Sequence, residues 1–255
     1  MKLTVLGCSG SLGAPGNPAS GYLVTSADST HAVMDLGPGT LAALQQVINP
    51  SQAHVLLSHL HADHCLDFPS LMVWRRFHPQ LAAQGRHFCI GPANTADQMG
   101  RLSSDEVGGI DDMSDTFALL TWQDGRAERV ESLTVTPFAM HHPVEAYALR
   151  VTETDSGRTL VYSGDTGFTE SLVEAARGAQ VLLCEAGWGP DSAGAPEGMH
   201  MSGAEAGRIA ALAGVETLVL THIPPWSDAQ ATAEAARKEF SGAILLARPG
   251  LELEV

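Results

Sequence analysis

One short run of metal-binding side chains constrains this chain more than any other feature of its sequence. Residues 58–67 contain four potential metal ligands within six positions: His59, His61, Asp63 and His64. The mostly apolar residues 53–57 predict a strand, and alternate residues at its end share one side, which brings the first two histidines together. Imidazole and carboxylate ligands together suit zinc and similar divalent metals. The run therefore predicts a metal site after this strand, the alternative being a polar loop that is only rich in histidine.

Further candidate ligands follow in chain order, each after or at the end of a run of β-type residues. They are the adjacent pair His141 and His142, then Asp165 in segment 163–167, and His222 in segment 221–224. In this order the motifs resemble the metallo-β-lactamase superfamily, and the resemblance covers nearly the whole chain from Leu3. It implies a single domain over residues 1–255 with a four-layer αββα sandwich, an α/β (α+β) fold. Periodicity alone predicts only one domain of mixed helices and strands.

The resemblance also implies two divalent metal ions. The ligands would divide into His59, His61 and His142 for one ion, Asp63, His64 and His222 for the other, and a bridging Asp165. His142 is taken as the third ligand because its segment resembles that of ribonuclease-Z-like members. From the residues alone, His141 has an equal claim. Zn²⁺ is the expected ion, and Mn²⁺ or Fe²⁺ also suits these ligands.

Catalytic roles follow from the same resemblance. Asp63 would act as a general base on a hydroxide that bridges the two ions. His200 would contact a non-bridging phosphoryl oxygen or protonate the leaving group; a helix-entry histidine, with Ser202 as the N-cap, is the alternative. Asp35 and Glu185 lie at strand ends and are expected to orient ligand histidines rather than to bind metal. A turn-capping aspartate is the alternative for Asp35.

The substrate is suggested by three segments, residues 56–67, 73–79 and 221–226. They look like the atypical class II cyclic-AMP phosphodiesterases of actinobacteria, within the ribonuclease-Z-like branch. The resemblance implies hydrolysis of 3′,5′-cyclic AMP to 5′-AMP in the cytoplasm. Trp188 and Trp226 could stack on adenine, and Arg75 could contact the phosphate. A place in the core or a subunit interface is the alternative for the tryptophans, and a solvated helix face for the arginine.

Charge and composition narrow the possible partners. The formal net charge is −15 and the sequence pI is about 5.0, so the surface repels a phosphate backbone and no extended nucleic acid is expected. Only residues 143–164 separate the third ligand from the bridging aspartate, which leaves no room for the basic arm that tRNA-processing members insert. No segment approaches membrane-spanning length, and the four scattered cysteines are expected to be buried free thiols. A small-molecule nucleotide substrate and, from family habit, a homodimer are expected.

Other functions remain open at this stage. Within the fold, the chain could be a ribonuclease-Z-like tRNA 3′ endonuclease, a general phosphodiesterase or a lactonase. Outside enzymes, it could be a metal-stabilised binding protein. The glycine-rich residues 7–13 lack the Gly-Lys-Ser/Thr ending of a nucleotide-binding P-loop, and a loop on the rim of the active site is expected instead.

Periodicity predicts the main elements. A strand at 3–6 and a hairpin of strands 21–25 and 31–36 precede an amphipathic helix at 40–48, capped by Thr40. Residues 116–122, 132–136 and 146–152 alternate like antiparallel strands. From residue 160 onward, strands and helices alternate in β-α-β order.

Overall fold

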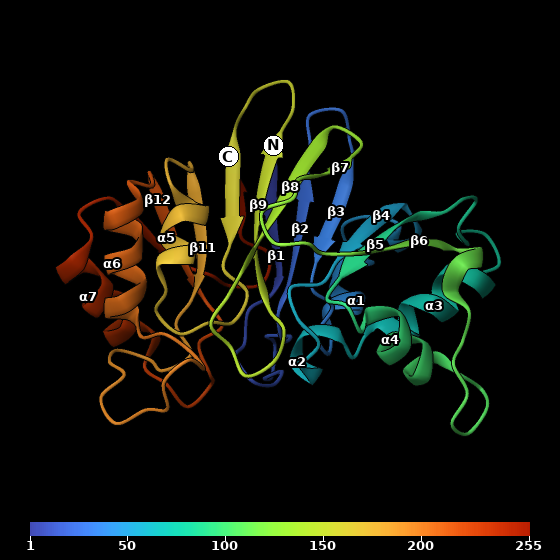
Figure 1. Cartoon of the computed structure of the whole chain (residues 1–255), viewed down its shortest axis with the longest axis horizontal. Helices are drawn as coiled ribbons and strands as arrows, with labels where there is room; N and C mark the ends of the chain where they lie inside the picture. Colours follow the sequence, from blue (N-terminus) through green and yellow to red (C-terminus); the bar gives the residue numbers. More distant parts are fainter.

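Two seven-stranded sheets face each other in the middle of the molecule, as seen in a computed structural model that describes residues 1–255 (Figure 1). The first sheet contains, in spatial order, β14 (Glu252–Glu254), β1 (Lys2–Gly7), β2 (Gly21–Thr25), β3 (His31–Met34), β4 (Ala53–Leu56), β5 (His87–Gly91) and β6 (Phe117–Thr121). The second contains β13 (Ala243–Leu246), β12 (Thr217–Thr221), β11 (Val181–Glu185), β10 (Thr159–Tyr162), β9 (Tyr147–Glu153), β8 (Leu133–Ala139) and β7 (Glu128–Val130).

Helices cover the outer faces of both sheets (Figure 1). The first sheet is flanked by α1 (Thr40–Leu44), the short α2 (Ala62–Cys65), α3 (Phe68–Phe77), α4 (Thr95–Ser103) and the 3₁₀ turns η1 (Pro50–Gln52) and η2 (Met113–Asp115). The second is flanked by α5 (Glu170–Ala176), α6 (Gly203–Ala213) and α7 (Ala229–Glu239). This is the αββα sandwich that the sequence predicts, and the prediction is confirmed. None of the helices combines the length and apolar character that a membrane crossing would require.

The central strands, such as β3, β4, β11 and β12, are largely apolar on both faces because they are buried on both sides of their sheet. In β3, Ala32 and Met34 belong to the core between the sheets, whereas Val33 belongs to the core under α1 and α3. A third apolar cluster packs α5, α6 and α7 against the second sheet. The four layers thus enclose three apolar cores.

Three element predictions differ from the structure. β6 pairs with β5 in parallel rather than antiparallel, because the connection between them is a long crossover through α4. The helix predicted at 40–48 ends at Leu44, and its N-cap is Gly39. Thr40 Oγ1 instead donates to Gly37 O at 2.7 Å. β7 and β14, each three residues long, carry too little periodicity to be predicted.

The strands that precede the candidate ligands all end at one edge of the sandwich. β3 pairs in parallel with β4, and β11 pairs in parallel with β10 and with β12. β8 runs in the same direction as β10 because both pair antiparallel with β9. Ligands in open α/β sheets bind outside the carboxyl ends of strands. The loops at this edge carry Asp35, residues 58–67, His142, Asp165 and His222.

Candidate metal centre

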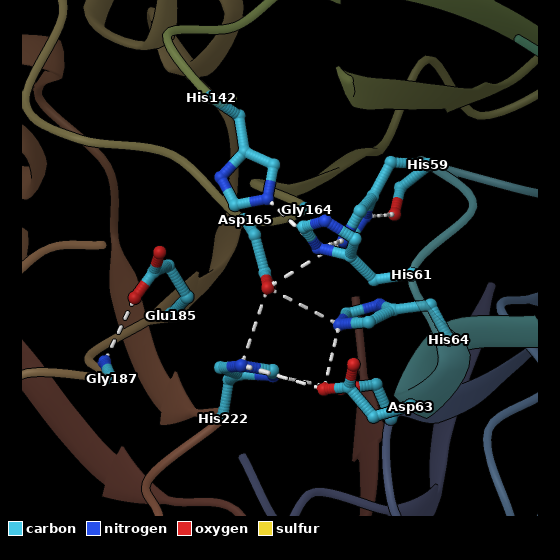
Figure 2. A network of polar contacts seen from close by, with 12 residues as sticks. His59, His61, Asp63, His64, His142, Gly164, Asp165, Glu185, Gly187 and His222 are labelled. Carbon is cyan, nitrogen blue, oxygen red and sulfur yellow. Dashed lines mark hydrogen bonds and ion pairs between the residues drawn. The ribbon is translucent and has the colours of Figure 1, made fainter. Parts of the chain in front are cut away.

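The first group of ligands comes from three strand ends. His59, His61, His142 and Asp165 each offer a ligand atom, and these atoms all lie within 4.8 Å of one another. The ring nitrogens are close: His61 Nδ1 lies 3.2 Å from His59 Nε2 and 3.1 Å from His142 Nε2. Figure 2 shows the three rings turned toward one point above Asp165. His142, not its neighbour His141, is therefore the histidine that the structure brings to the group.

The second group lies beside the first and shares one residue with it. Asp63, His64, His222 and Asp165 again offer ligand atoms within 4.8 Å of one another. Asp165 Oδ2 lies 3.3 Å from both His64 Nε2 and His222 Nε2, and 3.6 Å from His59 Nε2 of the first group. Asp165 thus stands between the two groups, at the centre of the network in Figure 2.

Hydrogen bonds on the other ring nitrogen orient most of these histidines. His64 Nδ1 donates to Asp35 Oδ2 at 2.7 Å, and His142 Nδ1 donates to the carbonyl of Met199 at 2.9 Å. Each of these two acceptors fixes the tautomer and leaves Nε2 with a free lone pair directed at the centre. Two hydroxyls make the corresponding bonds elsewhere: Ser58 Oγ to His59 Nδ1 and Ser20 Oγ to His222 Nδ1.

The fit of this donor set to metal ions can be tested on its unpaired atoms. Four buried side-chain atoms of the second group have no hydrogen-bond partner: Asp63 Oδ2, His64 Nε2, Asp165 Oδ1 and His222 Nε2. Leaving one buried polar atom unsatisfied costs about 1–3 kcal/mol, so four within one group of residues require partners. Imidazole nitrogens and carboxylate oxygens are the donors that divalent cations bind, and metal ions would satisfy these atoms. The residues therefore fit metal ions.

Asp35 is the polar hub beneath the centre. It is fully buried and accepts four hydrogen bonds, from Ser58 N at 2.8 Å, Ser58 Oγ at 2.7 Å, Tyr162 Oη at 2.8 Å and His64 Nδ1. Both Asp35 (φ 62°) and His222 (φ 54°) adopt left-handed backbone conformations, which non-glycine residues rarely hold. Such strain gathers at functional sites, where the surrounding structure enforces it.

His200 approaches Asp165 from a separate loop. Its Nδ1 donates to Glu185 Oε1 at 3.0 Å and lies 3.8 Å from Asp165 Oδ2. Burial opposes the charge on this ring, but the Glu185 carboxylate outweighs burial and raises the pKa of His200 to about 9. Glu185 also accepts from the backbone N–H groups of Thr166, Gly187 and Met201, which fixes its position. Glu185 therefore orients His200 rather than a metal-binding histidine.

Comparison with known proteins identifies the family. The family model of the β-lactamase superfamily domain matches residues 30–223, a stretch that contains all seven ligand candidates. The chain belongs to the metallo-β-lactamase superfamily. The protein ML1173 of Mycobacterium leprae is 50% identical to it over 96% of this chain and 85% of its own length.

Relatives with a described activity are more distant. The probable metallo-hydrolase YhfI of Bacillus subtilis is 32% identical over 100% of both chains. Its crystal structure matches with a TM-score of 0.87 at 28% identity and covers 100% of this chain and 99% of that chain. A ribonuclease Z of Haloarcula marismortui is 25% identical over 100% of this chain and 97% of its own length. With these relatives, the present chain is a metal-dependent hydrolase of the metallo-β-lactamase superfamily.

The glycine-rich loop lies against the candidate ligand His222, as expected for a rim of the site. Ser9 forms a β-bridge with Ile223, and Gly10 N donates to Ile223 O at 3.3 Å. A Cβ at Gly10 would collide with the backbone carbonyl of His222, so only glycine permits this approach. The loop holds the strained His222 backbone in place.

The structure places Arg75 away from the expected substrate site and leaves the expected role of Trp226 a prediction. Arg75 is 1% exposed, and its guanidinium donates to the carbonyls of Ser51 and Thr116 and lies 4.2 Å above the ring of Phe117. It is a core residue of the αββα sandwich, and its expected role as a phosphate contact is wrong. Trp226 is 68% exposed and lines none of the principal pockets.

The third expected substrate residue, Trp188, does lie beside the site. It lines a pocket of about 460 Å³ together with His141 and His200, and its ring stands edge-on to that of His200, with centroids 5.0 Å apart. Phe168 lines the same pocket and carried no sequence signal. Ser20 and Met199, which hydrogen-bond to His222 and His142, carry no sequence signal either. Ser58 does carry one, because it adjoins His59 in the metal-binding motif.

Proposed function

We propose that this metal-dependent hydrolase is a phosphodiesterase that binds two divalent ions, Zn²⁺ first among them, and hydrolyses 3′,5′-cyclic AMP to 5′-AMP. The observation that carries the proposal is the position of the Glu185–His200 pair, which faces the shared ligand Asp165 and borders a pocket of about 460 Å³. A protonated imidazole beside a dinuclear site suits a reaction that develops charge on phosphoryl and leaving oxygens.

The side chains of the site would have three roles: holding the ions, accepting a proton and donating one. Bound divalent ions would polarise the phosphate and ionise a water near neutral pH. His59, His61, His64, His142, Asp63, Asp165 and His222 would hold the ions. The Asp63 carboxylate, whose Oδ2 lies 3.4 Å from His64 Nε2 and 3.8 Å from His222 Nε2, would also accept a proton from the attacking water. His200, kept protonated by Glu185, donates a hydrogen bond to the phosphate or a proton to the leaving alkoxide.

Features of the surface support a small substrate. Residues 143–164 form little more than the antiparallel pair β9 and β10 and their turn, with no inserted arm. The net charge of −15 opposes binding of a long polyanion.

The four cysteines are free and buried, which suits a reducing cytoplasm.

A ribonuclease-Z-like tRNA 3′ endonuclease is the second candidate. It is favoured by the full-length similarity to proteins named ribonuclease Z, at 25–27% identity. Both candidate functions use the same metal centre. They differ in which part of the substrate the protein must bind outside that centre.

One experiment separates the candidates. Cyclic AMP, bis(p-nitrophenyl) phosphate and a tRNA precursor are compared on a single zinc- or manganese-loaded preparation, with Asp63→Ala as the matched inactive variant. We expect cyclic AMP to be turned over with the highest kcat/KM and Asp63→Ala to be inactive on every substrate. Accurate cleavage of the precursor at higher efficiency than cyclic AMP would establish the endonuclease instead. Failure on all three substrates would rule out both.

A further inference from the structure

A pocket next to His200 offers a place for the part of the substrate that does not react. Its volume of about 460 Å³ lies within the range of about 300–1,000 Å³ typical of ligand sites. One wall is the loop from Trp188 to His200, and another contains His141 and Phe168. Because His200 both lines the pocket and lies 3.8 Å from Asp165 Oδ2, a group that fills the pocket would be continuous with a phosphate bound beside His200 at the metal centre.

Apart from the imidazolium of His200, the charged side chains that line this pocket are all negative. Among its 12 lining residues, the carboxylates are Glu197 and Glu205, and no lysine or arginine is present. Glu205 is engaged in the capping box of α6, where Ser202 N and Oγ both donate to it at 2.8 Å. Glu197 makes no hydrogen bond or ion pair and is exposed on the rim. It is therefore the free charge that an incoming substrate meets.

The aromatic residues of the pocket supply the attraction. Trp188 is half-buried and presents its ring beside that of His200. Phe168 also lines the pocket, and the guanidinium of Arg208 lies 5.1 Å from the centre of its ring. Aromatic faces suit a planar or apolar group, and an acceptor-only carboxylate suits a group that donates hydrogen bonds.

We propose that Glu197 makes this pocket selective for phosphodiesters whose remaining portion is uncharged, such as a nucleoside, and that it rejects substrates bearing a second phosphate. The proposal rests on the proposed phosphodiesterase function. A like charge placed opposite a binding group suppresses the wrong ligand more than it aids the right one. The pocket would thus add a chemical filter to a metal centre that accepts any accessible phosphodiester.

The test uses two chromogenic substrates that differ by one phosphate: thymidine 5′-(p-nitrophenyl phosphate) and its 3′-phosphorylated form. We expect the wild type to favour the first by about tenfold or more in kcat/KM, with the difference shrinking as salt screens Glu197. Glu197→Gln should reduce the preference to a few-fold, and Glu197→Lys should abolish it. Glu239→Lys on α7 makes the same charge change on an exposed helix and should leave the preference intact.

Two kinetic outcomes would overturn the proposal. One is an equal preference in the wild type and both Glu197 variants. The other is a preference for the phosphorylated substrate that disappears in Arg208→Gln, which would assign a phosphate contact to that arginine.

Binding separates this proposal from the function on which it rests. Titration calorimetry compares 5′-AMP with adenosine 3′,5′-bisphosphate on metal-loaded protein, and requires no turnover. Weaker binding of the bisphosphate, relieved in Glu197→Lys, would support the charge filter even if no phosphodiester were hydrolysed. Equal binding in both proteins would reject the filter even if cyclic AMP were hydrolysed rapidly.

Discussion

At the scale of single residues, the ligand histidines are held by partners that leave them little freedom to turn. Asp35 accepts from His64, the Met199 carbonyl accepts from His142, and Ser20 bonds to His222. Pre-oriented lone pairs reduce the entropy lost when an ion binds. The affinity of the centre therefore depends on residues that touch no metal.

Replacing Asp35 by asparagine tests this dependence. An amide can present its NH₂ group to His64 Nδ1, which favours the wrong tautomer and turns Nε2 away from a metal-binding state. We expect the affinity for zinc to fall by about 10–100-fold, measured by competition with a chromogenic chelator. His200→Ala is the control, because His200 is not among the seven ligand candidates. An unchanged affinity for zinc in Asp35→Asn would show that Asp35 has no role in orienting His64.

Replacing His200 tests the catalytic role of the residue rather than its place in the centre. His200→Ala should lower kcat by about 10²–10⁴-fold with metal content unchanged, because a general acid contributes that much. Glu185→Gln should also lower kcat, but by a smaller factor than His200→Ala, because the His200 ring remains and loses only the carboxylate that holds it charged. A full rate with retained metal in His200→Ala would remove this residue from the mechanism.

At the scale of elements, one buried arginine joins three parts of the first sheet's outer layer. Arg75 projects from α3 and bonds to the carbonyl of Ser51 in η1 and to both Oγ1 and O of Thr116 before β6. No carboxylate pairs with it. Its function is to satisfy backbone acceptors that the packing of α3 has removed from water.

Arg75→Met should therefore reduce stability and leave catalysis unchanged. The carbonyls of Ser51 and Thr116 would lose their donors, at about 1–3 kcal/mol each, so we expect a loss of about 3 kcal/mol in the free energy of unfolding. Urea denaturation measures this loss, and KM for the phosphodiester should match the wild type. A raised KM with unchanged stability would return Arg75 to the substrate site.

A carboxylate on β9 ties the second sheet to a hairpin of the first. Glu153 accepts from Ser156 Oγ and from Ala27 N at 2.8 Å, and these bonds lower its pKa. A group whose pKa is lowered by folding stabilises the protein above its unfolded value of about 4.3 and loses that contribution as the pH falls through the folded value. Glu153→Gln should therefore lower Tm by about 2–4 °C at pH 7, and the gap should begin to shrink only once the pH falls below about 4.3. A gap that persists in acid would exclude this mechanism.

At the scale of the whole molecule, the sequence predicts the centre better than its surroundings. Asp165 and His222 could be placed because the resemblance to the superfamily implies ligands at strand ends and each of the two follows a β-type run; the parallel strands then deliver them to one edge. The orienting role of the Met199 carbonyl could not be predicted, since any residue carries that group. Arg75 was misplaced because its helix presents one face to the core and another to solvent, and sequence spacing alone did not distinguish them. Strand β14 is set by its pairing with β1 across nearly the whole chain.

The cluster also links the two halves of the sandwich. His59, His61, Asp63 and His64 come from the loop and short helix α2 that follow β4 of the first sheet, whereas His142, Asp165 and His222 follow strands of the second. Ions held between them would fasten the sheets together at this edge, and binding to the folded state alone stabilises it by mass action. The central claim is that these seven side chains form one site for two cations.

The number of ions that the purified chain retains tests this claim most directly. Protein is loaded with zinc, dialysed against metal-free buffer, and its metal content is measured by inductively coupled plasma mass spectrometry against protein concentration. The account predicts about two ions per chain, because the donors form two groups that share Asp165. Retention of less than one ion per chain would contradict it.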